Sequence, residues 1–192
     1  MVDSNDTEPP DPIEVASAPC SMHEVDPEYM GLAAPAFAQA PEFSVAQWFN
    51  TADELSMASL RGRVVVVEAF QMLCPGCVSH GIPQAKRIQE AFSPEEVVVL
   101  GLHTVFEHHA AMSPVSLQAF LHEYRVTFPV GVDRAHESGM PATMRAYALQ
   151  GTPTLLLIDA RGRLRKHWFG VVSDVIVGAE IMRLVLEQHS NS

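Results

Sequence analysis

Two cysteines separated by two residues are the side chains of this sequence best suited to chemistry. Cys74 and Cys77 follow a hydrophobic run that ends at Phe70, and Pro75 and Gly76 lie between them. At positions i and i+3 of a first helical turn, both sulfurs lie on one face and are close enough to form a small disulfide. The free N–H groups and positive dipole end of that turn favour a thiolate at Cys74. The pair therefore predicts thiol chemistry.

A carboxylate inside the same hydrophobic run is the second unusual side chain. Glu68 lies six residues before Cys74, within residues 64–70. Burial raises the pKa of a carboxyl, so Glu68 would exchange protons near neutral pH, for example with Cys77 when that thiol attacks a mixed disulfide. The alternative is that Glu68 reaches solvent past a sheet edge or pairs with a basic residue. The sequence leaves both interpretations open.

The elements that must position these residues alternate between strand and helix. Hydrophobic runs at residues 64–70 and 97–102 predict two strands. Residues 75–92 between them predict a helix that Gly81 and Pro83 should kink. This order indicates parallel strands joined by a helical crossover, which is typical of an α/β domain.

Further elements are predicted on both sides of this unit. Residues 43–60 predict two short strands as an N-terminal extension, and Ser113 with Pro114 marks a helix start. The later predicted elements are a strand at 128–132, a helix at 142–148, a hairpin of strands 154–158 and 164–169, and a final helix that follows Ser173 and carries Val175, Ala179, Met182, Val185 and Leu186.

Three distant segments should meet at one edge of the predicted sheet. Parallel strands end at a common edge, so Cys74 after one strand and His103 after its neighbour should both lie there. Thr152 and Pro153 open an antiparallel strand, which begins where its parallel neighbours end. His103 could then assist the thiolate, although simple loop polarity explains it equally well.

Length, composition and charge exclude several classes of protein. The 192 residues, 47% of them hydrophobic, suit one domain with appendages. The net charge is −11, and no Lys or Arg occurs before Arg61. The absence of a basic stripe argues against nucleic acid as a partner, and the acidic balance argues against a membrane surface.

The first forty residues differ in composition from the rest. Residues 1–40 are acidic and rich in proline, which predicts a disordered or draped tail before a folded domain of residues 41–192. The tail lacks the positive start and apolar core of a secretory signal, and no apolar run in the chain reaches the roughly 18 residues of a membrane span. We therefore expect a cytoplasmic protein in which Cys20 is an unpaired tail thiol.

These features together resemble the thioredoxin superfamily. The shared pattern over residues 41–189 is a strand with an acid, a Cys-x-x-Cys helix, a Thr-Pro pair that opens a late hairpin strand, and a closing helix. The strand at 128–132 and the N-terminal extension are similar to the TlpA-like thiol:disulfide oxidoreductase, or redoxin, branch. The resemblance implies an α/β thioredoxin-like fold with a central mixed sheet flanked by helices, an N-terminal extension and an extra β-α insertion.

The resemblance also implies a role for each site residue. Cys74 would be the exposed nucleophile, Cys77 the resolving thiol, Glu68 a buried acid, and Pro153 a cis-proline beside the active disulfide. The residues expected to contact substrate are Thr152, Pro75 and Gly76.

Three departures from the family pattern occur around the cysteines. Leu73 replaces the usual aromatic residue before the first cysteine, and the intervening dipeptide is Pro-Gly where thioredoxin has Gly-Pro. The helix proline, Pro83, comes six residues after Cys77, where five is usual. The resemblance therefore does not define the local geometry of this helix.

The predicted function is thiol–disulfide exchange without a metal or another cofactor. Its partners would be a disulfide-bearing protein or small molecule and a thiol reductant or oxidant. A peroxiredoxin-like thiol peroxidase is an alternative, although that branch has Thr where this chain has Gln71. A copper or zinc carrier is another, in which His80, His103 and residues 107–109 would join the two thiolates.

Overall fold

The hydrophobic run around Glu68 forms the centre of a mixed sheet. In a computed structural model, which describes residues 37–190, β2 (Val64–Phe70) is buried at every position. It pairs in parallel with β3 (Val97–His103) and antiparallel with β5 (Thr154–Ile158). Valine-rich strands suit this place because β-branched side chains pack well on a pleated surface that is covered on both faces.

The six strands of the sheet lie in the order β1-β4-β3-β2-β5-β6. β4 (Val130–Asp133) continues the parallel set beside β3, whereas β1 (Val45–Phe49) and β6 (Leu164–Phe169) are antiparallel strands at the two edges. The predicted crossover and late hairpin are both confirmed.

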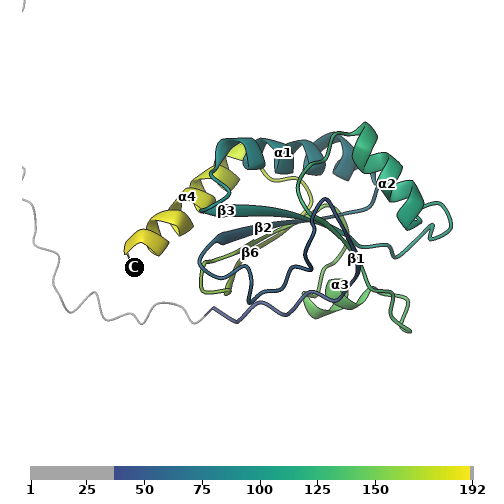
Figure 1. Ribbon diagram of the computed structural model, residues 1–192, viewed down its shortest axis with the longest axis horizontal. Helices are drawn as coiled ribbons and strands as arrows, with labels where there is room; N and C mark the ends of the chain where they lie inside the picture. Colours follow the sequence, from purple (N-terminus) through teal and green to yellow (C-terminus); the bar gives the residue numbers. More distant parts are fainter. Residues whose placement is uncertain (1–36, 191–192) are drawn as a thin grey trace, which may run out of the picture. The chain divides into compact units, whose positions relative to one another are not determined.

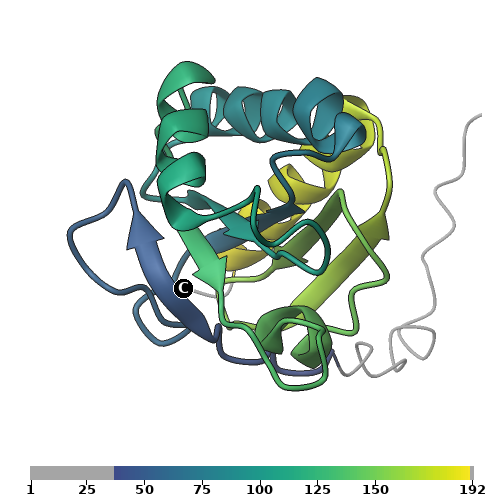
Figure 2. The same ribbon diagram turned by 90° about the vertical axis from the view of Figure 1, so that its right-hand side faces the viewer.

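Helices cover the two faces of the sheet unequally (Figures 1 and 2). Three of them lie on one face: α1 (Ile82–Ala91), α2 (Pro114–Glu123) and α4 (Asp174–Ser190). The short α3 (Ala142–Ala146) lies on the other face, where a second core cluster also includes residues of the N-terminal extension. β2 contributes side chains to both clusters, so its alternate residues belong to different cores.

The second short strand predicted within residues 51–60 is wrong. This segment forms turns, in which the Ser59 hydroxyl accepts from the backbone N of Ser56 at 3.0 Å and the Ser56 hydroxyl accepts from the backbone N of Ser59 at 3.1 Å. Serine side chains that bond nearby N–H groups compete with a strand ladder. Met57 and Leu60 are nevertheless buried. The apolar residues of this segment therefore pack into the core without forming a strand.

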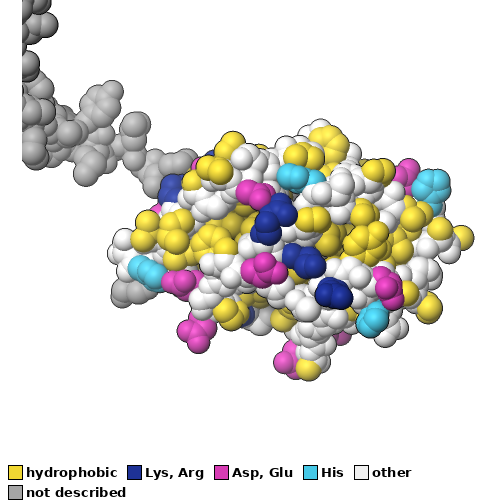
Figure 3. Space-filling view, turned by 90° about the horizontal axis from the view of Figure 1, so that it is seen from above, with side chains coloured by type: hydrophobic (Ala, Val, Ile, Leu, Met, Phe, Trp, Pro, Cys, Tyr) yellow, Lys and Arg dark blue, Asp and Glu magenta, His cyan; other side chains and the backbone are white. Residues whose placement is uncertain are grey.

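The apolar residues that marked the final helix in the sequence lie mostly at its surface. Of those five residues only Val185 is buried, whereas Val175 is 80% exposed and Leu186 is 58% exposed. Apolar side chains are visible on this helical side of the molecule in Figure 3. α4 carries two apolar stripes, and the buried one consists of Val177, Ile181, Leu184 and Val185.

The predictions for residues 1–36, including the tail and Cys20, lie outside the described residues. Within residues 37–190, Ala40 donates its backbone N–H to Gly162 at 2.9 Å, so the start of this segment follows the β5–β6 hairpin. The boundary between tail and domain at residue 40 stays a prediction. None of the helices described has the length and apolar character needed to cross a bilayer.

A buried carboxylate holds α3 against the sheet. Asp133, at the end of β4, accepts hydrogen bonds from the backbone N of Thr143 and of Met144, both at 2.8 Å, and from the Thr104 hydroxyl at 3.0 Å. Its residue exposure is 6%. The contact joins the end of β3, β4 and the inserted helix at one point.

We expect Asp133→Ala to lower the free energy of unfolding by about 2–4 kcal/mol, because three buried donors lose their acceptor. Urea denaturation of the reduced protein measures this change. Glu137→Ala, in the exposed loop just before α3, is the matched control and should stay within about 0.5 kcal/mol of the wild type. Equal stability of the two variants would contradict the anchoring role.

Candidate active site

The first cysteine lies in a turn where two distant segments meet. The Sγ of Cys74 accepts the backbone N–H of Cys77 at 3.3 Å and lies 3.5 Å from the carbonyl oxygen of Thr152. The turn begins with a bond from the backbone N of Cys74 to the carbonyl of Gln71 at 3.1 Å. Cys74 and Thr152 therefore share one edge of the sheet, as the strand order predicted.

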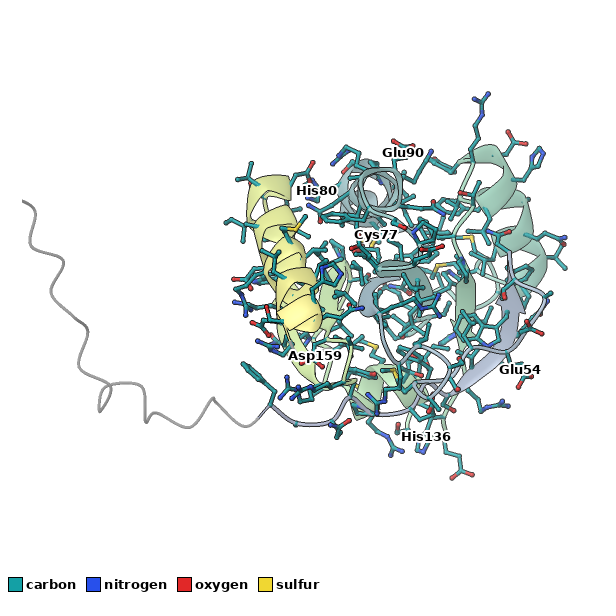
Figure 4. The ribbon with its side chains drawn as sticks, turned by 60° about the vertical axis from the view of Figure 1, so that its left-hand side comes forward. Glu54, Cys77, His80, Glu90, His136 and Asp159 are labelled. Atoms are coloured by element: carbon teal, nitrogen blue, oxygen red, sulfur yellow. The ribbon has the colours of Figure 1, made fainter. Side chains whose placement is uncertain are left out.

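The two thiols differ sharply in accessibility. Both are free in this structure, and Cys74 is half-buried whereas Cys77 is fully buried. Figure 4 shows Cys77 among the side chains of the interior. Burial raises the pKa of Cys77, and its hydrogen bond with the neighbouring Cys74 sulfur raises it further. The sulfur of Cys74 can therefore meet a substrate, whereas the buried sulfur of Cys77 keeps its proton.

The helix that carries the second cysteine begins with a wide turn. Residues 77–81 form the π-helix η2 (Cys77–Gly81), and α1 follows directly with Pro83 in its first turn. A bond of the i→i+5 type closes a loop one residue longer than the i→i+4 bond of an α-helix. The π-turn thus accommodates the additional residue between Cys77 and Pro83, and it stands where the sequence predicted a kink.

Glu68 is a buried acid. It is 1% exposed, its Oε1 has no hydrogen-bond partner among the described residues, and no ion pair there involves it. Burial raises its pKa well above the ordinary value, and the negative charge of Cys74 adds to this effect. Of the two interpretations left open by the sequence, the structure supports burial and not a solvent-exposed or paired carboxylate.

Two glycines make room for the acid and for the Thr-Pro segment. A Cβ on Gly81 would overlap Oε1 of Glu68 and lie 3.3 Å from Cβ of Pro153. A Cβ on Gly76 would lie 3.2 Å from Cδ of the same proline, whose bond to Thr152 is cis. Sequence reasoning treated Gly81 only as a kink; the signal it missed was a glycine four residues after Cys77, on the same side of the helix.

A groove of about 420 Å³ opens beside Cys74. Pro75 and Thr152 line it, whereas Gly76 packs toward Pro153 and is not part of the lining. Residues that sequence reasoning did not assign to thiol–disulfide exchange form the other walls, and two of them, Glu107 and His108, were expected near the thiols only in the metal-carrier alternative. These walls consist of Gln71, Leu73, Phe106, Glu107, His108, Ala111, Met112, Gly151 and Phe169.

His103 does not act as a charged neighbour of the thiol. It pairs in register with Phe70, their rings are 5.2 Å apart, and the imidazole is buried away from the groove lining. Burial lowers the pKa of His103 to about 4, so the ring is neutral near pH 7. It therefore supplies no positive charge for a Cys74 thiolate. Within residues 37–190, no three His, Cys, Asp or Glu side chains are grouped so that they could hold a metal ion.

Comparison with solved structures defines the class of protein. A thioredoxin-like superfamily protein is 61% identical, with a TM-score of 0.77 over 78% of this chain and 97% of its own. A thiol-disulfide isomerase from Corynebacterium glutamicum is 47% identical, with a TM-score of 0.73 over 76% of this chain and 96% of its own. The thioredoxin domain of a thiol-disulfide oxidoreductase from Bacteroides vulgatus, at 15% identity, covers 78% of this chain and 99% of its own with a TM-score of 0.61, and shows the fold alone. The protein is an oxidoreductase with a thioredoxin-like fold.

The family follows from the sequence match. Residues 37–167 match the AhpC/TSA family, and the chain belongs to it. A search of curated proteins gave no significant match. The predicted membership of the thioredoxin superfamily and the predicted α/β fold are both confirmed.

We expect Gly81→Ala to destabilise the protein by about 1–3 kcal/mol, because the new methyl group must displace the Glu68 carboxyl or Pro153. Gly178→Ala, within α4, is the control: nothing lies within 4 Å of a Cβ there, and alanine favours a helix by about 0.5–1 kcal/mol. Urea denaturation of both reduced variants measures the difference. A Gly81→Ala variant as stable as Gly178→Ala would contradict the close contact.

We expect the stability of the wild type to fall as pH rises from the ordinary pKa of Glu68, near 4.5, through its raised value in the folded state. In that window the folded protein binds one proton more than the unfolded chain, so the free energy of unfolding falls by about 1.4 kcal/mol per pH unit. Glu68→Gln cannot ionise and avoids this loss. Its stability relative to the wild type should therefore increase with pH in urea titrations.

The control for this titration is Glu54→Gln, which removes a carboxylate from an exposed segment. Its stability relative to the wild type should change little over the same pH range. A pH-independent difference for Glu68→Gln would show that burial does not perturb this acid.

Proposed function

We propose that this protein is a thiol–disulfide oxidoreductase whose active site is Cys74-Pro75-Gly76-Cys77. The observation that carries the proposal is the unequal exposure of the two sulfurs, which lie close enough for the Cys77 N–H to reach the Cys74 sulfur. A reachable nucleophile and a sheltered second thiol are what two-step exchange needs. The 47% identical structure, described as a thiol-disulfide isomerase, supports the same chemistry.

In the first step, the Cys74 thiolate attacks one sulfur of a substrate disulfide. A bond forms between that sulfur and Cys74, and the other substrate sulfur leaves as a thiolate that takes up a proton. In the second step, the Cys77 thiolate attacks the Cys74 sulfur and releases the first substrate sulfur, which is protonated in turn. The substrate gains two electrons, and a Cys74–Cys77 disulfide remains for a dithiol partner to reduce. The reverse sequence oxidises a dithiol substrate.

Glu68 supplies the proton transfer that the second step requires. Burial keeps the Cys77 thiol protonated, so a base must remove its proton before attack. Glu68 lies against Gly81, one turn along the helix from Cys77, and burial raises its pKa toward that of a thiol, which favours proton exchange between the two groups. Directly or through one water, Glu68 accepts this proton and returns it in the reverse reaction.

Thr152 and Pro153 bind the substrate beside the nucleophile. Thr152 lies at the groove with its carbonyl toward Cys74, and Pro153 supports the segment against Gly76 and Gly81. A disulfide-bearing protein or small molecule enters the groove over Pro75. The β4–α3 insertion and the N-terminal extension support placement in the TlpA-like branch.

The residue three positions before Cys74, Gln71, argues against the peroxidase alternative. Gln71 has 2% exposure, its amide oxygen accepts the backbone N of Phe106 at 3.4 Å, and it offers no hydroxyl where the peroxiredoxin branch has Thr. Rapid consumption of hydrogen peroxide that depends on Cys74 would reverse this preference.

We expect Cys74→Ser to lower the reduction of insulin or a model disulfide by about a thousandfold or more, because no thiolate remains at the groove. Cys77→Ser should instead accumulate a mixed disulfide between Cys74 and the substrate, which non-reducing gels and mass mapping identify. Cys20→Ser is the matched control and should keep wild-type activity. A Cys74→Ser variant with the wild-type rate would overturn the assignment.

A further inference from the structure

The groove beside Cys74 has an uneven distribution of charge. Its lining contains one carboxylate, Glu107, and no Lys or Arg in the part of the chain that the structure describes. His108 also lines it. With histidine counted as neutral, the formal charge of the groove walls is negative.

Gln71 connects this carboxylate to the loop that carries the nucleophile. Its amide Nε2 donates a long hydrogen bond to Oε1 of Glu107 at 3.5 Å, and its amide oxygen accepts the backbone N of Phe106 at 3.4 Å. Because Gln71 is buried, these contacts leave it little freedom to move. The negative charge is thus held on the β3–α2 segment that faces the cysteine turn.

The remaining walls strengthen the effect of that charge. Leu73 is 55% exposed and Phe169 is 56% exposed, and both line the groove together with Ala111 and Met112. Apolar walls lower the local dielectric, so a charge beside them acts over a longer distance than one on an open surface. A Cys74 thiolate adds a second negative charge to the same groove.

We propose that this groove selects disulfides that carry positive charge close to the reacting sulfur and discriminates against anionic ones, with Glu107 as the specificity-determining residue and Gln71 as its positioning residue. The inference rests on the proposed function, because it concerns substrates of the Cys74 attack. A cationic group beside the scissile disulfide would approach Glu107 as the sulfur reaches Cys74. An anionic group would be repelled by both charges.

Three small disulfides of different charge test the proposal. Cystamine is cationic, 2-hydroxyethyl disulfide is neutral and oxidised glutathione is anionic. The second-order rate constant for oxidation of the reduced protein by each is measured at pH about 8 by acid quench and thiol alkylation. Rate ratios are compared between variants, so the intrinsic reactivity of each disulfide cancels.

We expect Glu107→Gln to reduce the preference for cystamine over oxidised glutathione by about two- to fivefold, the effect of one partly exposed charge. Glu107→Lys should reduce it further, and the rate with the neutral disulfide should change least. High salt should weaken the preference of the wild type.

The matched control is Glu54→Gln, which removes one negative charge outside the groove and at the periphery of the domain (Figure 4). It should keep the wild-type preference. An equal change in this control, or no change in either Glu107 variant, would overturn the selectivity while leaving the exchange activity intact. A wild type inert toward all three disulfides would overturn the proposed function and this inference together.

Discussion

Burial of the Glu68 carboxyl in the central strand is the constraint on which the edge that carries the two cysteines depends. β2 is covered on both faces, so a carboxyl on it has no route to solvent and projects toward the helix of the second cysteine. Gly81 must lack a side chain to admit it, and Pro153 packs against the same glycine. The position of the acid therefore determines which residues fit around the dithiol.

Burial also gives the two sulfurs different chemical properties. Cys77 lies in the apolar core, where ionisation is unfavourable, while Cys74 lies at the margin and receives a backbone N–H from the helix start. His103 is also neutral because of burial, so it supplies no positive charge for a thiolate. The polar group that the structure directs at the Cys74 sulfur is the backbone N–H of Cys77.

Much of this arrangement could be predicted because it depends on local patterns and on strand order. A hydrophobic run followed by Cys-x-x-Cys, and a Thr-Pro pair before a late strand, place Cys74 and Thr152 at one edge by topology alone. The buried face of α4 could not be predicted, since its two apolar stripes have the same helical period. The contact between Gln71 and Glu107 joins residues 36 positions apart, and the periodicity of a sequence does not predict such a pair.

The wide turn η2 bears on how the length of this helix can vary among related proteins. Insertions and deletions usually occur in loops, because a residue added within a helix rotates everything beyond it by about 100°. A π-turn confines the surplus residue to one turn, so the cysteine end and the Pro83 end both keep their orientation toward the sheet. Loss of one residue between them would restore a regular helix, and this scaffold can therefore change length beside the two cysteines without rebuilding their surroundings.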